Sequence, residues 1–381
     1  MAAFDAGVAV IGLGAWGSAA LWSLARRGVR AVGIERFTPG HAFGSSHGGT
    51  RMFRTACLEH PDLVPLAQRS ARLWRELEAE TGRRLFEPTG GVLIGPRDGH
   101  IVSGTLAAAR EHALPVEVWD AGRLRRELPQ HGELPDHHCG VWEPAAGLLR
   151  PEAAIRAALD AAAGAGAQVY PDTRVTGIEP VDGGVVVHTP TRDLRVEQAV
   201  VTAGPWLPAL VPGLPLEAVR MPVTWFRAGD SRAADFALAR LPVFIRELDD
   251  GQCVWGHGAE DDGLVKVGLE DSGGRFEVID PDACDRSVRP EDWTLLADRL
   301  TTALPGLGAL PSKAAVCMFT RSPDKQFLVG RPRGDRRLVI AGGCSGHGFK
   351  HATGVGEIVA DLVTGKPPSC PAAFMDPDRF L

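Results

Sequence analysis

Short apolar runs alternate with longer stretches of helical spacing along most of the chain. Residues 8–11 and 31–34 are runs of strand-forming apolar residues. Between them, residues 18–27 place apolar side chains at helical intervals and end at Gly28. This pattern predicts a strand–helix–strand unit at the beginning of the chain, which is typical of a parallel sheet.

The rest of the chain divides into three kinds of segment. Helical spacing occurs at 63–81, 103–112, 121–128, 151–165 and 290–304, and strand–turn–strand patterns at 86–94 and 168–203. Short alternating strands fill 216–309 and predict an antiparallel sheet. Residues 338–363 again show a strand, a glycine-rich loop and a helix.

These segments predict an α/β fold with two domains. A Rossmann-like nucleotide-binding domain, discontinuous in sequence, is expected from residues 1–85, 146–215 and 315–381. An antiparallel-sheet substrate domain is expected from residues 86–145 and 216–314.

The first strand runs directly into a G-x-G-x-x-G motif. Gly12 allows the tight turn, Gly14 lets the backbone approach a pyrophosphate, and Gly17 allows close packing of helix and strand. Glu35 follows about 20 residues later, where a carboxylate can bind a ribose hydroxyl. The motif predicts a dinucleotide and leaves FAD and NAD open. NAD is disfavoured because it gives no role to the second glycine-rich segment near the C-terminus.

Composition narrows the function classes. A chain of 381 residues with net charge −6 has no basic surface for nucleic acid. No apolar window is long enough for a membrane span, and we expect a cytoplasmic protein. Seven scattered cysteines without C-x-x-C spacing fit a reducing compartment. The triplet His137–His138–Cys139 is read as a loop, and no metal site is expected.

Two further segments carry candidate chemistry. Residues 36–54 form a long, polar, glycine-rich stretch with the motif Ser46-His-Gly-Gly-Thr-Arg-Met-Phe-Arg54. Loops of this length are commonly functional. Near the C-terminus stands Ser345-Gly-His-Gly-Phe-Lys350, and Val-Cys-Met occurs around Cys317.

Taken together, these motifs resemble the glycine/sarcosine oxidase group of flavoprotein amine oxidases, in the glycine/D-amino acid oxidase superfamily. Within it, the sarcosine and N-methyltryptophan oxidases are most similar. The resemblance covers essentially the whole chain. It implies FAD as the cofactor, attached covalently through Cys317. It also implies a cofactor site formed by Gly12, Gly14, Ala15, Trp16, Gly17, Glu35, Arg36, Ser45, Thr50, Arg51, Val175, Gly204, Cys317, Gly346, Gly348, Phe349 and Lys350.

The resemblance assigns catalytic roles to three residues. Lys266 matches the lysine that activates oxygen at the flavin, where a fixed cation stabilises developing negative charge. Arg51 and His47 match residues beside the flavin ring, where positive charge stabilises the reduced, anionic cofactor.

The resemblance also implies a substrate pocket. Arg54 and Lys350 match the pair that holds a substrate carboxylate. Glu270 stands where the sarcosine enzyme has a histidine, and Phe319 and Trp255 replace pocket tyrosines. A substrate bulkier than sarcosine is therefore expected, and Glu270 is available to a second polar or cationic group.

The function implied is oxidation of a secondary amine that bears a carboxylate, such as an N-methyl or cyclic imino acid. The products are an imine and hydrogen peroxide from O2, and the enzyme is expected to act as a monomer. Two alternatives stay open: a dehydrogenase with a different electron acceptor, and a flavin-binding subunit without turnover.

Overall fold

The structure, a computed structural model, describes residues 4–132, 134–271 and 276–380. Its first sheet has eight strands and a parallel centre. Here β1 (Ala6–Ile11) lies between β2 (Ala31–Ile34) and β12 (Asp193–Val201). The remaining strands are β9 (Gln168–Tyr170), β10 (Gly177–Val181), β11 (Gly184–His188), β18 (Leu328–Gly330) and β19 (Leu338–Gly342). The central strands are apolar runs because both faces of the sheet are covered.

The second sheet also has eight strands. Its order is β17 (Lys313–Arg321), β13 (Glu217–Arg227), β16 (Leu264–Leu269), β15 (Cys253–His257), β14 (Val243–Glu247), β5 (Gly91–Pro96), β7 (His138–Glu143) and β6 (Glu117–Asp120). Every pairing is antiparallel except that of β14 with β5. A small third sheet contains β3 (Arg51–Phe53), β8 (Gly147–Leu149) and β4 (Phe86–Pro88). The predicted fold class is confirmed.

Helices cover both sheets. The α-helices are α1 (Ala15–Arg26), α2 (Leu63–Thr81), α3 (His100–Glu111), α4 (Ala121–Glu127), α5 (Pro151–Gly164), α6 (Leu207–Leu210), α7 (Thr294–Ala303) and α8 (Ala352–Val363). Short 3-10 helices are η1 (Gly204–Trp206), η2 (Asp230–Phe236), η3 (Pro290–Asp292), η4 (Pro332–Gly334), η5 (Phe349–His351), η6 (Ala373–Met375) and η7 (Pro377–Phe380). Helix α2 has the same ends as the sequence predicts.

One face of the first sheet forms the largest core. Apolar side chains of α1, α2, α5 and α8 pack together against β1 and β19. Helices α1 and α8 approach closely, because a Cβ added to Gly356 would lie 2.5 Å from the carbonyl carbon of Ala19. The opposite face has its own core, which includes Ile11, Ile34 and Leu207.

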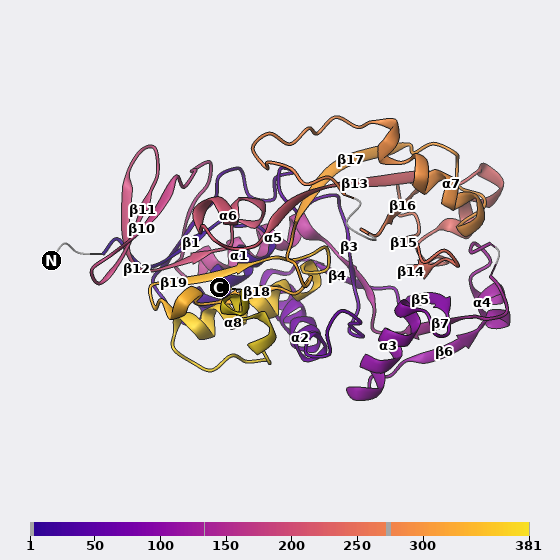
Figure 1. The fold of residues 1–381 in the computed structure, drawn as a ribbon, viewed down its shortest axis with the longest axis horizontal. Helices are drawn as coiled ribbons and strands as arrows, with labels where there is room; N and C mark the ends of the chain where they lie inside the picture. The colour runs from indigo at the N-terminus through magenta and orange to yellow at the C-terminus, as the bar shows by residue number, and fades with distance from the viewer. Residues whose placement is uncertain (1–3, 133, 272–275, 381) are drawn as a thin grey trace.

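The two large sheets belong to separate lobes in Figure 1. The C-terminus and the strands of the first sheet lie at the left, and β5–β7 lie at the right. The long strands β13 and β17 extend from one lobe toward the other. Strand β17 pairs with β13 along its length, although most of it follows the predicted domain boundary at residue 315. The domain boundaries stay a prediction.

Three predicted helices begin elsewhere than expected. Helix α1 begins at Ala15, not at residue 18, because its first turn already includes the glycine motif, and the Ser18 amide donates to the Gly14 carbonyl oxygen (3.0 Å). Helix α3 begins at His100, not at residue 103, because Glu247 Oε2 of β14 accepts a hydrogen bond (3.0 Å) from the Ile101 amide. The predicted helix 290–304 is a 3-10 turn followed by α7. The Asp292 carboxylate accepts from the Arg289 amide and from Arg220, and the helix restarts beyond it. The changes at α3 and α7 depend on residues distant in sequence.

The triplet at 137–139 is not wholly a loop, which corrects the sequence prediction. His138 and Cys139 begin β7, where they pair with Pro96 and Gly95 of β5. A carboxylate also lies beside the triplet, because Asp249 Oδ1 is 3.1 Å from His137 Nε2 and 2.7 Å from His138 Nε2. The sequence does not reveal this contact because Asp249 is more than a hundred residues away.

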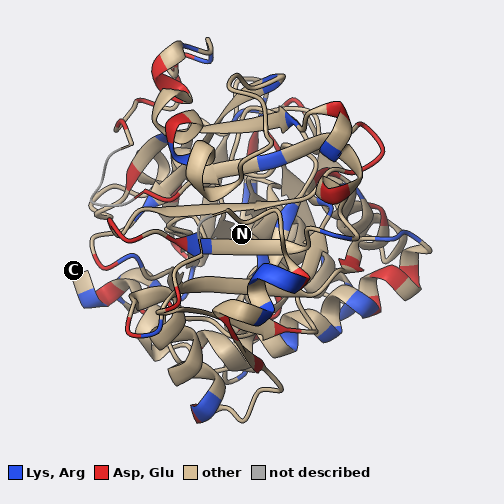
Figure 2. Ribbon diagram, turned by 90° about the vertical axis from the view of Figure 1, so that its right-hand side faces the viewer, with Lys and Arg blue, Asp and Glu red and all other residues tan. Residues whose placement is uncertain are grey.

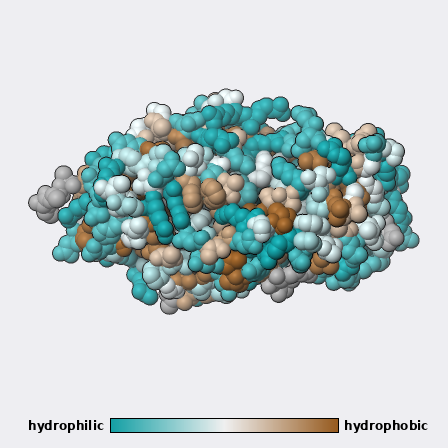
Figure 3. All heavy atoms as spheres, turned by 90° about the horizontal axis from the view of Figure 1, so that it is seen from above, coloured by the Kyte–Doolittle hydropathy of each residue, from teal (hydrophilic) through white to brown (hydrophobic). Residues whose placement is uncertain are grey.

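The surface is mixed in character. Basic and acidic residues are interspersed along the ribbon in Figure 2, and polar residues dominate the face in Figure 3, with scattered apolar ones. Within the described parts of the chain, no helix combines the length and apolar character needed to cross a membrane.

Candidate active site

A cavity of about 810 Å³ is lined by residues of both large sheets. The predicted site residues that line it are Gly12, Gly14, Ala15, Trp16, Glu35, Arg36, Ser45, Thr50, Arg51, Arg54, Val175, Gly204, Trp255, Lys266, Glu270, Cys317, Phe319, Gly346, Gly348, Phe349 and Lys350. Gly17 and His47 are not among the lining residues. One continuous space therefore connects the glycine motif to the predicted carboxylate pair.

At one end, the glycine motif leaves room for a ligand beside the first turn of α1. Gly12 has φ +86°, and a Cβ on Gly17 would lie 1.8 Å from the Gly12 carbonyl oxygen. At Gly14, by contrast, an added Cβ would meet only Ser46 Oγ, at 3.9 Å. Free space at the N-terminus of a helix suits a phosphate group.

The acid after β2 is buried at this end of the cavity. Glu35 Oε2 accepts from the Leu13 amide (2.7 Å), and its Oε1 accepts from the Phe37 amide (3.0 Å). Its neighbour Arg36 pairs with Asp282 and lies 5.2 Å from the centre of the Trp206 ring. The Glu35 carboxylate is thereby fixed in position on the cavity wall. Together with the glycine turn, it fits a dinucleotide.

The C-terminal glycine-rich segment packs against α1, beside the first motif. Trp16 Nε1 donates to the Gly348 carbonyl oxygen (3.0 Å), and a Cβ at Gly348 would lie 2.7 Å from the Trp16 ring. Gly346, with φ +85°, has nothing within 4 Å of an added Cβ. The two glycine-rich segments, more than 300 residues apart in sequence, thus line one cavity.

Cys317 lies on β17 beside Arg51. The sulfur is 3.7 Å from Arg51 Nη2, whose guanidinium also donates to the carbonyl oxygens of Thr50 (2.7 Å) and Ser45 (2.8 Å). Burial raises the pKa of the Cys317 thiol, although Arg51 and Lys266 act against this rise. Burial therefore outweighs the two cations and favours the neutral thiol.

Lys266 is buried on β16 and held by the loop before β3. Its Nζ donates to the carbonyl oxygens of Gly48 (2.8 Å) and Thr50 (2.9 Å) and to Thr50 Oγ1 (3.2 Å). Burial, followed by the nearby positive charge of Arg51, holds the pKa of Lys266 well below its usual range. The amine is fixed at three acceptors and faces the cavity.

Two histidines lie near this lysine. His257 Nε2 is 2.8 Å from Thr50 Oγ1, and burial lowers the pKa of His257 to about 4. Burial, together with Arg51, likewise lowers the pKa of His47 to about 4. A neutral His47 that does not line the cavity is a poor source of positive charge. Its predicted catalytic role gains no support from this position.

The predicted carboxylate pair already holds a carboxylate of the chain. Arg54 Nη2 lies 2.5 Å from Glu59 Oε1, and Lys350 Nζ lies 3.5 Å from the same oxygen. Arg54 also donates to the Ala56 carbonyl oxygen, and Lys350 to that of His347. Burial would raise the pKa of Glu59, but Arg54 and Lys350 outweigh it and hold that pKa well below its usual range. Two buried cations thus share one partly buried anion.

The remaining predicted pocket residues form another part of the cavity wall. Trp255 Nε1 donates to the Leu269 carbonyl oxygen (3.0 Å), which fixes the indole next to Glu270. Phe319 is buried on β17, 6.5 Å from the Phe276 ring. Burial raises the pKa of Glu270, with Arg54 acting against the rise. This wall is aromatic and contains one carboxyl group with a weakened tendency to ionise.

Sequence reasoning missed several groups at the site. Glu59 has a local signal, since it is an acid five residues after Arg54 in the same loop. Glu152 Oε1 accepts from the amides of Gly48 (2.7 Å) and Gly49 (3.2 Å) and so fixes the loop that holds Lys266. His100 and His257, which both line the cavity, have no signal in the sequence, because each comes from an element distant from the motifs.

Comparison with known proteins agrees with this geometry. The family model described as FAD dependent oxidoreductase matches residues 7–362. A monomeric sarcosine oxidase of Streptomyces avermitilis is 37% identical over 378 residues, covering 98% of this chain and 97% of that protein. An N-methyl-L-tryptophan oxidase of Yersinia pestis is 34% identical over 365 residues, covering 95% of this chain and 96% of that protein.

A solved structure shares the fold over nearly its whole length. The open form of NikD, described as an unusual amino acid oxidase essential for nikkomycin biosynthesis, has a TM-score of 0.83 and 25% identity. The match covers 98% of this chain and 97% of NikD. The resemblance inferred from the motifs is confirmed, and FAD is the supported cofactor. The chain belongs to the family of FAD-dependent oxidoreductases, with similarity to sarcosine oxidases over nearly its full length.

Proposed function

We propose that the protein oxidises a secondary amine that bears a carboxylate, such as an N-methyl amino acid or a cyclic imino acid. The amine becomes an imine, which water hydrolyses, while O2 is reduced to hydrogen peroxide. The observation that carries this proposal is the convergence of two buried cations, Arg54 and Lys350, at the end of a cavity that begins at the nucleotide motif. The names of the relatives, sarcosine oxidase and N-methyl-L-tryptophan oxidase, denote enzymes of N-methylated amino acids.

The chain's residues divide the work of substrate binding. Arg54 offers planar donors and Lys350 a point charge, which together can orient a carboxylate. Glu59 shares both cations, so an incoming carboxylate takes donors that Glu59 now occupies. Trp255 and Phe319 provide aromatic walls for the substrate side chain. Burial favours the uncharged form of Glu270. We infer that this residue can contact a polar group of the substrate and does not strongly repel the substrate carboxylate.

FAD, when bound, would accept two electrons together with the hydrogen from the substrate carbon next to nitrogen. We propose that Gly12, Gly14 and Glu35 hold its dinucleotide part and that Cys317 is its covalent attachment point. Arg51, which is 3.7 Å from the Cys317 sulfur, favours the thiolate that such a bond requires. Lys266 is proposed to stabilise the negative charge that develops as oxygen is reduced. We further propose that the enzyme acts as a monomer.

The visible spectrum of the purified protein tests the proposal. Anaerobic mixing with N-methyl amino acids, cyclic imino acids and primary amino acids, each followed by air, would identify the substrate class. We expect bleaching by a secondary amino acid and rapid return of colour, with one hydrogen peroxide formed per amine. Bleaching followed by slow return in air would mean a dehydrogenase with another acceptor. A yellow protein that no compound bleaches would mean a non-catalytic flavin-binding subunit.

A further inference from the structure

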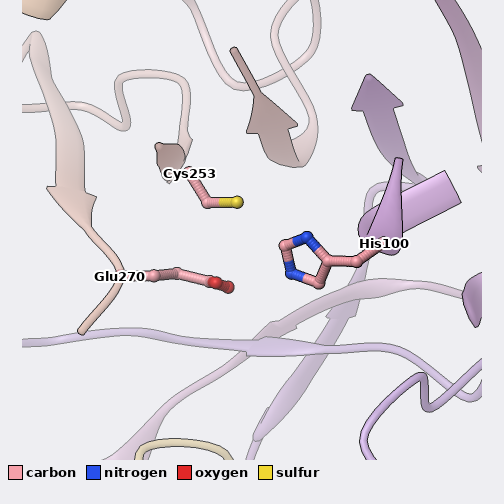
Figure 4. A group of neighbouring side chains, drawn as sticks. All are labelled: His100, Cys253 and Glu270. Carbon is pink, nitrogen blue, oxygen red and sulfur yellow. The ribbon is translucent and has the colours of Figure 1, made fainter. Parts of the chain in front are cut away.

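A histidine, a cysteine and a glutamate meet at the amine end of the cavity. His100 comes from the first residue of α3, Cys253 from β15, and Glu270 follows β16. One ligand atom from each lies within 4.8 Å of the other two. In Figure 4 the imidazole, the thiol and the carboxylate point toward a common space. We propose that these three side chains form a binding site for a divalent transition-metal ion of the Zn²⁺ type.

The donor set determines the class of ion. Thiolate, imidazole and carboxylate are the three protein ligands that Zn²⁺ uses. Tetrahedral coordination, with bonds of about 2.0–2.3 Å, requires ligand atoms roughly 3.3–3.8 Å apart, so the side chains must close by at most about 1.5 Å. The exposed His100 side chain has room for such a movement, whereas the buried Cys253 is fixed within the sheet. Oxygen-preferring ions such as Mg²⁺ are disfavoured by the sulfur and nitrogen donors.

A neighbouring carboxylate orients the histidine. Glu247 Oε1 lies 3.2 Å from His100 Nδ1, while Oε2 of the same residue accepts from the Ile101 amide at 3.0 Å. This arrangement leaves His100 Nε2 available as the ligand. A metal-binding histidine commonly donates its other ring N–H to a carboxylate, which fixes the ring and raises its basicity. Glu247 is a positioning residue in this site.

The site opens onto the cavity. His100 and Glu270 both line it, so a fourth coordination position can take water or a group of the bound amine. A metal ion there would engage Glu270, which is proposed above to face the substrate side chain. The metal would therefore compete with the amine for this wall. This competition rests on the proposed function, whereas the metal site itself does not.

A second cluster offers the main rival position. His137, His138 and Asp249 also lie within 4.8 Å of one another. Both histidines already bond to the same Asp249 oxygen, the carboxylate is largely exposed, and the cluster has no sulfur donor. The cavity cluster is the stronger site because it combines a buried thiol with an oriented histidine.

Calorimetric titration of the chelator-treated holoenzyme with ZnCl2 tests the proposal without relying on turnover. We expect one Zn²⁺ per chain, with affinity reduced by at least about tenfold in Cys253→Ala and in His100→Ala. Cys139→Ala, a matched buried cysteine in β7, and His137→Ala should bind as the unaltered protein does. Since His100 is exposed, its variant gives an answer even if Cys253→Ala fails to fold.

The opposite results would overturn the site. Loss of binding in His137→Ala with retention in His100→Ala would place the ion at the rival cluster. No binding, or equal affinity in all variants, would also reject the proposal. As a second readout, Zn²⁺ should raise the apparent KM for a secondary amino acid, and a chelator should reverse the change. His100→Ala should be insensitive. Activity that Zn²⁺ leaves unchanged, together with intact binding, would reject the competition and retain the metal site.

Discussion

The two ends of the cavity differ in whether backbone or side chains form them. The nucleotide end is formed by backbone and glycines of short contiguous motifs, and its shape follows from Gly12, Gly14 and Gly17. The amine end is formed by charged side chains from two distant parts of the chain, with Arg54 and Glu59 in one loop and Lys350 near the C-terminus. A backbone site fixes a ligand common to many proteins, whereas a side-chain site can change its substrate through single replacements. For this reason the sequence motifs indicate the cofactor, whereas they leave the side chain of the amine open.

The largest effect is expected from a replacement that disrupts the nucleotide end. Gly17→Ala places a Cβ 1.8 Å from the Gly12 carbonyl oxygen, so the helix and the turn must separate. We expect a loss of about 3 kcal/mol or more in the free energy of unfolding, and loss of bound flavin. Chemical denaturation and the ratio of flavin to protein absorbance measure both. Gly14→Ala is the matched control, because its Cβ meets only Ser46 Oγ at 3.9 Å, and it should fold. Equal stability of the two variants would contradict this account.

Lys266 allows the two half-reactions to be separated. Lys266→Met should slow reoxidation by O2 by about 100- to 1000-fold, since one charge-stabilising donor is lost, and leave anaerobic bleaching nearly unchanged. Because burial lowers the pKa of Lys266, oxygen reactivity should fall as pH rises through that lowered pKa, where the proton is lost. Stopped-flow spectra over a pH series check both expectations. An unchanged oxygen reaction in the variant would remove Lys266 from the mechanism.

A smaller effect is expected at the carboxylate pair. Arg54→Lys retains the charge but loses the planar donors, so kcat/KM for a secondary amino acid should fall by about 10- to 100-fold. A secondary amine without a carboxylate serves as the matched substrate, and its kcat/KM should hardly change. If both substrates lose the same factor, Arg54 supports the fold and does not select the carboxylate.

The smallest effect is expected for Glu59, whose replacement changes the charge at the amine end. Glu59→Gln removes the competing anion, so KM for a carboxylate substrate should fall by about threefold to tenfold, or about 0.7–1.4 kcal/mol. The pKa of Glu59 is lower in the folded protein than its unfolded value of about 4.3. The ionised carboxylate therefore stabilises the fold fully above the unfolded pKa, and this stability is lost as pH falls through the folded-state pKa. Urea denaturation against pH should therefore show a weaker acid dependence in the variant. A raised KM would mean that Glu59 assists substrate binding.

Much of the fold follows from local patterns. Helix α2 and strand β2 have the predicted ends, because periodicity and flanking residues determine them. The start of α3 could not be predicted, since Glu247 of a distant strand caps it. Strand β7 was missed at His138 because its pairing with β5 is a tertiary contact.

The candidate site divides in the same way. The motifs bring nearly all predicted residues to one cavity, yet the partner of Arg54 and Lys350 is absent from the prediction although Glu59 is five residues from Arg54. The His100–Cys253–Glu270 cluster could not be predicted, because no spacing in the sequence connects its members.

One measurement tests the central claim most directly: the rate of anaerobic flavin bleaching by an N-methyl amino acid and by its primary amide. The two compounds share the reacting C–N bond and differ only in the charge that Arg54 and Lys350 would bind. The account predicts fast bleaching by the acid and slow bleaching by the amide. Equal rates, or faster bleaching by the amide, would contradict the proposed role of the buried cation pair.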